Sequence, residues 1–216
     1  MAARPVRHLV VIAYGLVLST LGSLGLFGPY LTWEGQSRLD QLIVLFLLPI
    51  TASVIYSLIG SLQRRKLPQQ ENGSADRAIQ GIVFWVVLFL MGVHTLMLAV
   101  LFSVEWVQPW AKRGVVMLLG VTLVGIGNLL PRTRPNMALG IRTARTLSDR
   151  QLWMLTHRMS GYATVAVGVV TLFASVFLQG DQVAAVPAIA FAIAGILLLA
   201  GYWKFSRVDT AAQQFR

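Results

Sequence analysis

Residues 127–158 read GNLLPRTRPNMALGIRTARTLSDRQLWMLTHR and lie between two long apolar stretches. The basic side chains of this segment are all arginines, and Asp149 is its only acid. Its arginines are Arg132, Arg134, Arg142, Arg145, Arg150 and Arg158. A strongly basic connection between apolar stretches is typical of a cytoplasmic loop in a membrane protein. The segment therefore orients the rest of the chain, and it is also a candidate binding site.

The composition predicts an integral membrane protein. Of the 216 residues, 56% are hydrophobic and only 12% are charged, whereas about a quarter of the residues in a soluble domain are charged. Apolar stretches near twenty residues are long enough to cross a bilayer as helices. The predicted spans are residues 8–27, 41–62, 79–103, 114–130, 159–179 and 183–203. We therefore expect an all-α bundle of six transmembrane helices, with successive helices antiparallel.

The basic residues predict the orientation of this bundle. Of the 18 lysines and arginines, only Arg38, Lys112 and Arg113 fall on the side opposite the N-terminus. The positive-inside rule therefore predicts that both termini are cytoplasmic. Four tryptophans are expected to anchor the span ends in the headgroup region. They are Trp33, Trp106, Trp110 and Trp203.

A polar stretch at residues 63–78 divides the chain. It contains Pro68, Gly73 and several charged side chains, a composition typical of a linker. We expect a two-helix part at residues 1–62 and a four-helix part at residues 79–216.

The arginine-rich segment is predicted to fold as an ordered cytoplasmic loop followed by a helix start. Pro131 and Pro135 disfavour helix, so the fourth span should end near Leu130. Asn136 and Gly140 both suit turns. Ser148 with Gln151 three residues later predicts a capping box, and hence a short helix at residues 149–157 that leads into the fifth span.

Two interpretations of the arginines remain open. Cytoplasmic loops collect basic residues for orientation and attract anionic lipid headgroups. Lysine would serve that purpose equally well, whereas the planar guanidinium fork also matches carboxylate and phosphate groups.

The spaced residues of this segment resemble the signature of the SdpI family. They are Gly127, Asn128, Pro131, Arg134, Pro135, Asn136, Gly140, Ile141, Arg142, Thr143, Thr146, Leu147, Ser148, Trp153, Thr156, His157, Arg158 and Gly161. The resemblance covers residues 127–161 and is poor in the two-helix part at residues 1–62. Members of the family are multi-pass proteins of the bacterial cytoplasmic membrane.

The resemblance implies resistance to, or signalling in response to, an exported antimicrobial peptide, and in some members the binding of a cytoplasmic repressor at the membrane. We expect the ligand to bind at the cytoplasmic face of the signature segment. The candidate ligand-binding residues are Asn128, Arg134, Asn136, Gly140, Arg142, Thr143, Thr146, Trp153, His157 and Arg158.

The remaining chemistry of the chain favours a protein that is not an enzyme. It has no cysteine and only eight acidic residues, none within a predicted span. No motif predicts a catalytic residue, a metal site, a cofactor or nucleic-acid binding. His94 lies inside the third span, where a polar residue usually faces the bundle interior. A neutral histidine bonded to a neighbouring helix is one interpretation, and a proton relay or ligand site is the other.

Two alternatives to the peptide-resistance function stay open. A small-solute or lipid transporter would use His94 within the bundle. A membrane enzyme would act on an anionic lipid headgroup at the arginine-rich face.

Overall fold

Every element that the structure describes is a helix. The computed structural model describes residues 6–23, 38–64, 74–102, 104–178 and 182–213. In chain order the elements are α1 (Val6–Ser23), α2 (Arg38–Arg64), α3 (Ser74–Leu101), η2 (Gln108–Trp110), α4 (Ala111–Leu129), η3 (Leu130–Arg132), α5 (Ala144–Ser148), α6 (Arg150–Phe177) and α7 (Gln182–Gln213).

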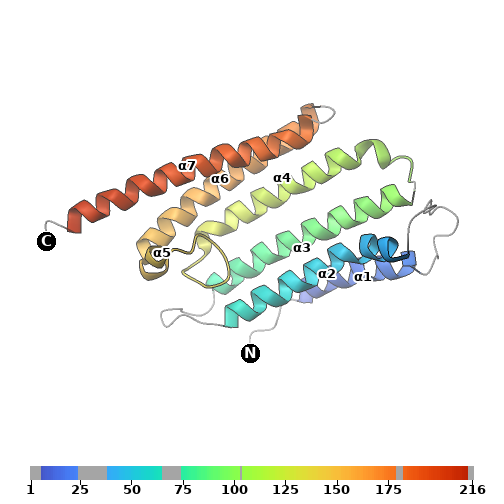
Figure 1. The fold of residues 1–216 in the computed structure, drawn as a ribbon, viewed down its shortest axis with the longest axis horizontal. Coiled ribbons are helices and arrows are strands. Elements are labelled where there is room, and N and C mark those ends of the chain that lie inside the picture. The colour runs from blue at the N-terminus through green and yellow to red at the C-terminus, as the bar shows by residue number, and fades with distance from the viewer. Residues whose placement is uncertain (1–5, 24–37, 65–73, 103, 179–181, 214–216) are drawn as a thin grey trace.

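The six long helices run alternately in opposite directions (Figure 1). Each of them packs against the next long helix in the chain, and the contact between α4 and α6 is the most extensive. The predicted packing of successive helices as antiparallel neighbours is therefore confirmed. The starts of α1, α3 and α6 lie at the same end of the bundle as α5 (Figure 1).

Five of the described helices are long and apolar enough to cross a membrane. Their candidate spans are Leu42–Gln63, Arg77–Leu101, Gln108–Arg132, Arg150–Phe177 and Gln182–Leu199. The apolar part of α1, Arg7–Leu21, is shorter, and the predicted first span at residues 8–27 extends into residues 24–37, outside the described part. The helices indicate a multi-pass membrane protein, while a sixth span and the membrane orientation stay predictions.

Large apolar side chains point outward along these helices. Leu47 of α2, Ile193 of α7 and Phe177 of α6 are 56%, 55% and 72% exposed. Such surfaces are favourable in hydrocarbon, where helices satisfy their own backbone hydrogen bonds. Trp106 and Trp110 are also exposed, next to the start of α4, as expected of interfacial anchors, whereas Trp33 lies outside the described residues.

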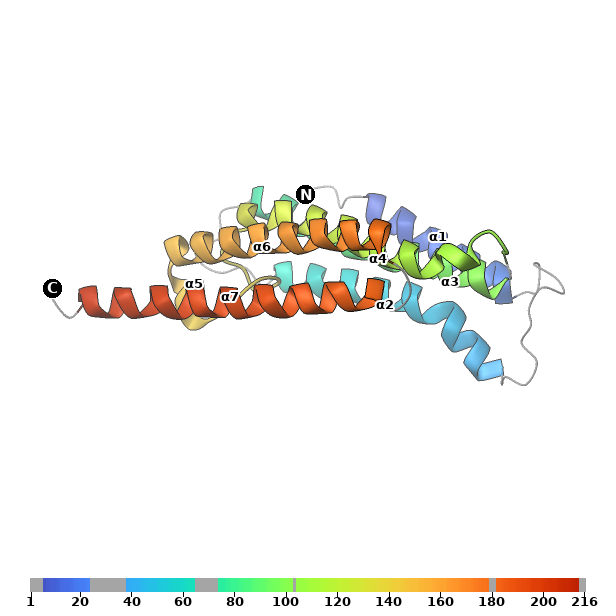
Figure 2. The same ribbon diagram turned by 90° about the horizontal axis from the view of Figure 1, so that it is seen from above.

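Helix α2 bends partway along its length (Figure 2). Pro49 lies inside this helix and lacks the backbone N–H that would bond to the preceding turn. The buried Pro49 is therefore the physical cause of the change in direction.

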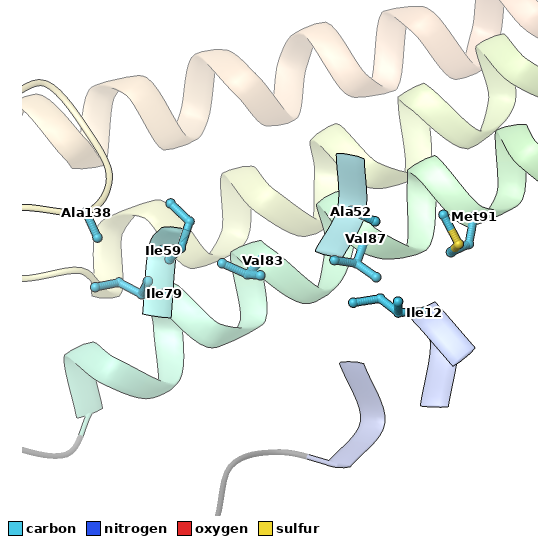
Figure 3. Close-up of a cluster of buried hydrophobic side chains, with 8 residues drawn as sticks. All are labelled: Ile12, Ala52, Ile59, Ile79, Val83, Val87, Met91 and Ala138. Atoms are coloured by element: carbon cyan, nitrogen blue, oxygen red, sulfur yellow. The ribbon is translucent and has the colours of Figure 1, made fainter. Parts of the chain in front are cut away.

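A cluster of buried apolar side chains joins α1, α2 and α3 to the arginine-rich segment. Its members are Ile12, Ala52, Ile59, Ile79, Val83, Val87, Met91 and Ala138. Figure 3 shows Ala138, from the segment after α4, near Ile59 and Ile79 at one end of the row. The segment is thus packed onto α2 and α3 as well as onto α6.

The predicted boundaries agree with the structure at the end of the fourth span. Helix α4 ends at Leu129 and continues as the single turn η3, which contains Pro131. The central residues 65–73 of the predicted linker at 63–78 lie outside the described part, and α3 already begins at Ser74. The division into a two-helix and a four-helix part stays a prediction.

Candidate functional site

The loop after η3 is folded around the side chain of Asn136. Its Oδ1 atom accepts hydrogen bonds from the backbone N–H groups of Ala138 and Leu139, at 2.9 and 2.8 Å. Its Nδ2 donates to the carbonyl of Arg134 at 2.8 Å. Asn136 is 2% exposed. An asparagine that bonds its own loop in this way fixes a turn, so its role here is to hold the backbone.

A stacked pair of aromatic rings on α6 anchors this loop. The rings of Trp153 and His157 have centroids 3.8 Å apart and planes 13° apart. Both side chains are buried. The indole Nε1 donates to the carbonyl of Thr133 at 3.1 Å, so the start of the loop is tied to α6. We call residues 133–148, together with Trp153 and His157, the cap.

His157 joins α6 to the middle of the cap. Its Nδ1 lies 2.9 Å from the carbonyl of Trp153, and its Nε2 accepts from the backbone N–H of Ile141 at 3.3 Å. The network therefore assigns the neutral tautomer with the proton on Nδ1. Both ring nitrogens are used within the protein, which makes this histidine a structural support of the cap.

Gly140 provides the close approach that this hydrogen bond needs. Its φ is +108°, a conformation that L side chains rarely adopt. A Cβ atom at this position would overlap the Nε2 atom of His157. The glycine is thus required twice, by its backbone conformation and by the imidazole that lies against it.

Thr143 and Thr146 close the cap as a capping box at the start of α5. The side chain of Thr143 accepts from the N–H of Thr146 at 3.1 Å, and the side chain of Thr146 accepts from the N–H of Thr143 at 2.9 Å. Thr146 also donates to the carbonyl of Ile141 at 2.8 Å and is fully buried. These two threonines hold the backbone in place.

The predicted capping box at Ser148 and Gln151 is wrong. Ser148 is the last residue of α5, and its hydroxyl bonds back to the carbonyls of Ala144 and Arg145. Asp149 is the N-cap of α6, where its carboxylate accepts from the N–H groups of Gln151 and Leu152 at 2.7 and 3.1 Å. Aspartate caps as well as serine does and adds charge complementarity to the helix dipole. Residues 150–157 are therefore the first turns of α6, and the short helix of this segment is α5.

Besides Gly140, three of the candidate residues are exposed on the cap or beside it. Arg142 donates from Nη1 to the carbonyl of Met137, so its side chain lies along the loop. Arg158 donates from Nε to the hydroxyl of Tyr162 at 3.1 Å and lies 5.7 Å from the centroid of that ring. The two guanidinium groups thus have different partners. Asn128, near the end of α4, is exposed as well.

Arg134 lies elsewhere, at a cavity of about 780 Å³ beside the cap. Four further arginines from four elements line the same cavity: Arg7 of α1, Arg77 of α3, Arg132 of η3 and Arg150 of α6. None of these four is among the predicted ligand-binding residues, although Arg132 and Arg150 belong to the arginine-rich segment. The positive-inside pattern locates them on one side of the membrane, but only the packing of α1 and α3 against the cap brings them together.

His94 has a partner on a neighbouring helix. Its Nε2 lies 2.9 Å from the hydroxyl of Ser19, which also contacts the carbonyls of Gly15 and Leu45. His94 is fully buried. This contact links α3 to α1, and it is compatible with either interpretation of His94.

Comparison with known proteins finds a family model that matches the cap and the helices after it. Residues 132–202 match the model of the SdpI/YfhL protein family, which covers the cap, α6 and most of α7. The resemblance to the SdpI family is therefore confirmed for this segment. Neither a curated protein nor a solved structure matches the chain.

Proposed function

From a cap and two helices similar to the SdpI/YfhL family, set in a bundle of apolar helices, we propose that the chain is a non-enzymatic membrane protein of the SdpI type. It resists, or signals in response to, an exported antimicrobial peptide. It lies in the bacterial cytoplasmic membrane with both termini inside. Its recognition site consists of two exposed residues, Arg142 of the cap and Arg158 of α6 beside it, which bind an anionic group of the peptide or of a cytoplasmic partner.

The observation that supports this proposal is that buried side chains of the cap hold its backbone, whereas Arg142 is exposed. Asn136, Thr146 and His157 use their polar groups to hold the backbone, and Gly140 allows the close approach to His157. Arg142, directly after this fixed turn, is exposed and uses one terminal nitrogen on Met137. A guanidinium has five N–H donors in a planar fork, so donors remain for a carboxylate or phosphate. Such a positioned arginine is suited to directed recognition.

The test removes the planar guanidinium fork of Arg142 and keeps its positive charge. A deletion strain that carries the Arg142→Lys variant is challenged with secreted peptides of neighbouring strains, and its growth is compared with that of the wild type. We expect sensitivity to increase about tenfold, because a charge-assisted, bidentate hydrogen bond is lost. Immunoblots of the membrane fraction check that protein levels are equal.

The matched control is Arg145→Lys, a change of the same kind at an exposed position of α5 outside the candidate set. This variant should protect as well as the wild type. Wild-type protection by Arg142→Lys as well would mean that the loop arginines serve orientation alone, and the recognition site would have to be abandoned.

Transport of a small solute or lipid is the second candidate function, and the buried pair of His94 and Ser19 is the observation that favours it. A polar pair within a bundle is a typical component of a solute or proton path. Solute or proton flux in proteoliposomes that the change His94→Phe abolishes would favour transport over peptide recognition. Flux that is absent from the wild type, or unchanged in this variant, would assign the pair to helix packing.

A further inference from the structure

The cavity beside the cap concentrates positive charge. Its volume is about 780 Å³, and none of the described residues that line it is aspartate or glutamate. Its five arginines come from α1, α3, η3, the loop and α6. Like charges that share a hollow repel one another, and the repulsion grows where protein walls displace water. An anion in the cavity would remove this repulsion.

Apolar side chains also line the cavity. They include Phe84 and Trp85 of α3, Leu129 of α4 and Met154 of α6. Arg7 lies over the ring of Phe84, with its guanidinium carbon 4.8 Å from the centroid. Basic and apolar groups therefore meet within one hollow, and a ligand that fills it must be amphipathic.

The position of the cavity indicates where such a ligand comes from. The lining residues lie at the starts of α1, α3 and α6 and at the end of α4, that is, where apolar helices reach one end of the bundle (Figure 1). The basic residues predict that this end faces the cytoplasm. The cytoplasmic leaflet carries anionic lipids, and basic pockets between transmembrane helices on that side bind phosphate headgroups.

We propose that this cavity binds the phosphate headgroup of an anionic phospholipid. Arg77, Arg132 and Arg150 contact the phosphate, whose oxygens match the guanidinium fork. The wall of Phe84, Trp85 and Leu129 receives the start of an acyl chain. Arg142 and Arg158, the residues of the proposed peptide-recognition face, do not line the cavity. Lipid binding is therefore independent of the proposed function.

Titration of the purified full-length chain tests this site. The protein, in a neutral detergent, is titrated with short-chain phosphatidylglycerol while its intrinsic tryptophan fluorescence and its thermal unfolding temperature are followed. Trp85 lies in the cavity wall, so a bound lipid changes its surroundings. The double change Arg77→Gln with Arg132→Gln should weaken binding by at least about 10-fold, because each basic residue near an anionic headgroup contributes severalfold.

The matched control is the double change Arg142→Gln with Arg145→Gln, which removes the same charge from the cap outside the cavity. Its affinity for phosphatidylglycerol should stay within about twofold of the wild type, because screening weakens distant exposed charges. If both double changes weakened the binding of phosphatidylglycerol equally, the positive charge of the whole surface would account for binding. The proposed site would then be overturned.

Two further ligands identify the source of the phosphate. Phosphatidylcholine of the same chain length should bind at least about 10-fold more weakly, because its headgroup has no net charge. Inorganic phosphate at millimolar concentration should not displace phosphatidylglycerol, since it cannot use the apolar wall. Equal binding of the two lipids, complete displacement by inorganic phosphate, or no binding at all would each overturn the proposal. None of these results would bear on protection against a peptide.

Discussion

Gly140 and His157 show how a single backbone conformation positions the cap. The positive φ of Gly140 brings its backbone against the imidazole, and the next N–H, that of Ile141, bonds to Nε2. A side chain at position 140 would meet both a strained conformation and the edge of a ring that is stacked on Trp153. The order of the cap therefore depends on the absence of one methyl group.

The change Gly140→Ala should lower the free energy of unfolding by about 1–3 kcal/mol, because alanine is strained at positive φ and its Cβ displaces His157. Titration with sodium dodecyl sulfate, followed by tryptophan fluorescence, measures this quantity. The matched control is Gly195→Ala on α7, where a Cβ would have no neighbour within 4 Å. The control should leave stability unchanged or raise it, because alanine favours helix. Equal stability of the two variants would contradict the role assigned to Gly140.

At the scale of elements, α4 and α6 pack through two reciprocal glycine contacts. A Cβ on Gly120 would lie 3.0 Å from the carbonyl oxygen of Gly168, and one on Gly168 would lie 2.9 Å from that of Gly120. Gly127 and Gly161 form the second pair, at 2.8 and 2.7 Å. Small residues let backbones approach closely, and this approach stabilises helix pairs in lipid. These two glycine pairs also align the end of α4 with the start of α6, and so position the two ends of the cap.

We expect Gly168→Ala to destabilise the α4–α6 pair by about 1–3 kcal/mol, since the new methyl group meets backbone that cannot move aside. Gly92→Ala on α3 is the control. Its Cβ would lie 2.9 Å from the end of the Leu118 side chain, which can rotate away. The same detergent titration compares the two variants. If Gly92→Ala lowers the free energy of unfolding as much as Gly168→Ala does, close backbone approach is not what stabilises the contact between α4 and α6.

At the scale of the whole molecule, the alternating helices bring the basic residues to one end. Arg7, Arg77, Arg134 and Arg150 belong to segments far apart in the sequence, yet they line one cavity. The start of α4 lies at the opposite end of the bundle (Figure 1), and there Arg113 donates to the carbonyl of Leu178 at 3.2 Å. This asymmetry is the basis of the predicted orientation, with the cap in the cytoplasm.

Single-cysteine labelling tests this orientation, and the chain is suited to it because it has no cysteine of its own. Ser148→Cys lies at the cap and Gln108→Cys lies in η2, and both positions are exposed. In intact cells a membrane-impermeant maleimide should label the Gln108→Cys variant alone. After permeabilisation it should label both variants. Labelling of Ser148→Cys in intact cells would reverse the orientation and with it the cytoplasmic site.

Local patterns predicted much of the fold and some features of the cap. Apolar stretches predicted the helices, because a helix in lipid must be apolar over its whole length. Pro131 predicted the end of α4, and Asn136 with Gly140 predicted an ordered turn. The error at Ser148 came from a competing local signal, since Asp149 beside it caps a helix equally well.

The sequence alone determined that the chain is a helical membrane protein, that its basic residues are unevenly distributed, and that its central segment resembles the SdpI family. These properties depend on composition and on residues close together in the chain. Only the tertiary structure, through the packing of the cap onto α6, decided that His157 holds the cap from within. It also decided that Arg7 and Arg77 share a cavity with Arg134. Both arrangements depend on contacts between segments that are not adjacent in sequence, which hydropathy and spacing do not specify.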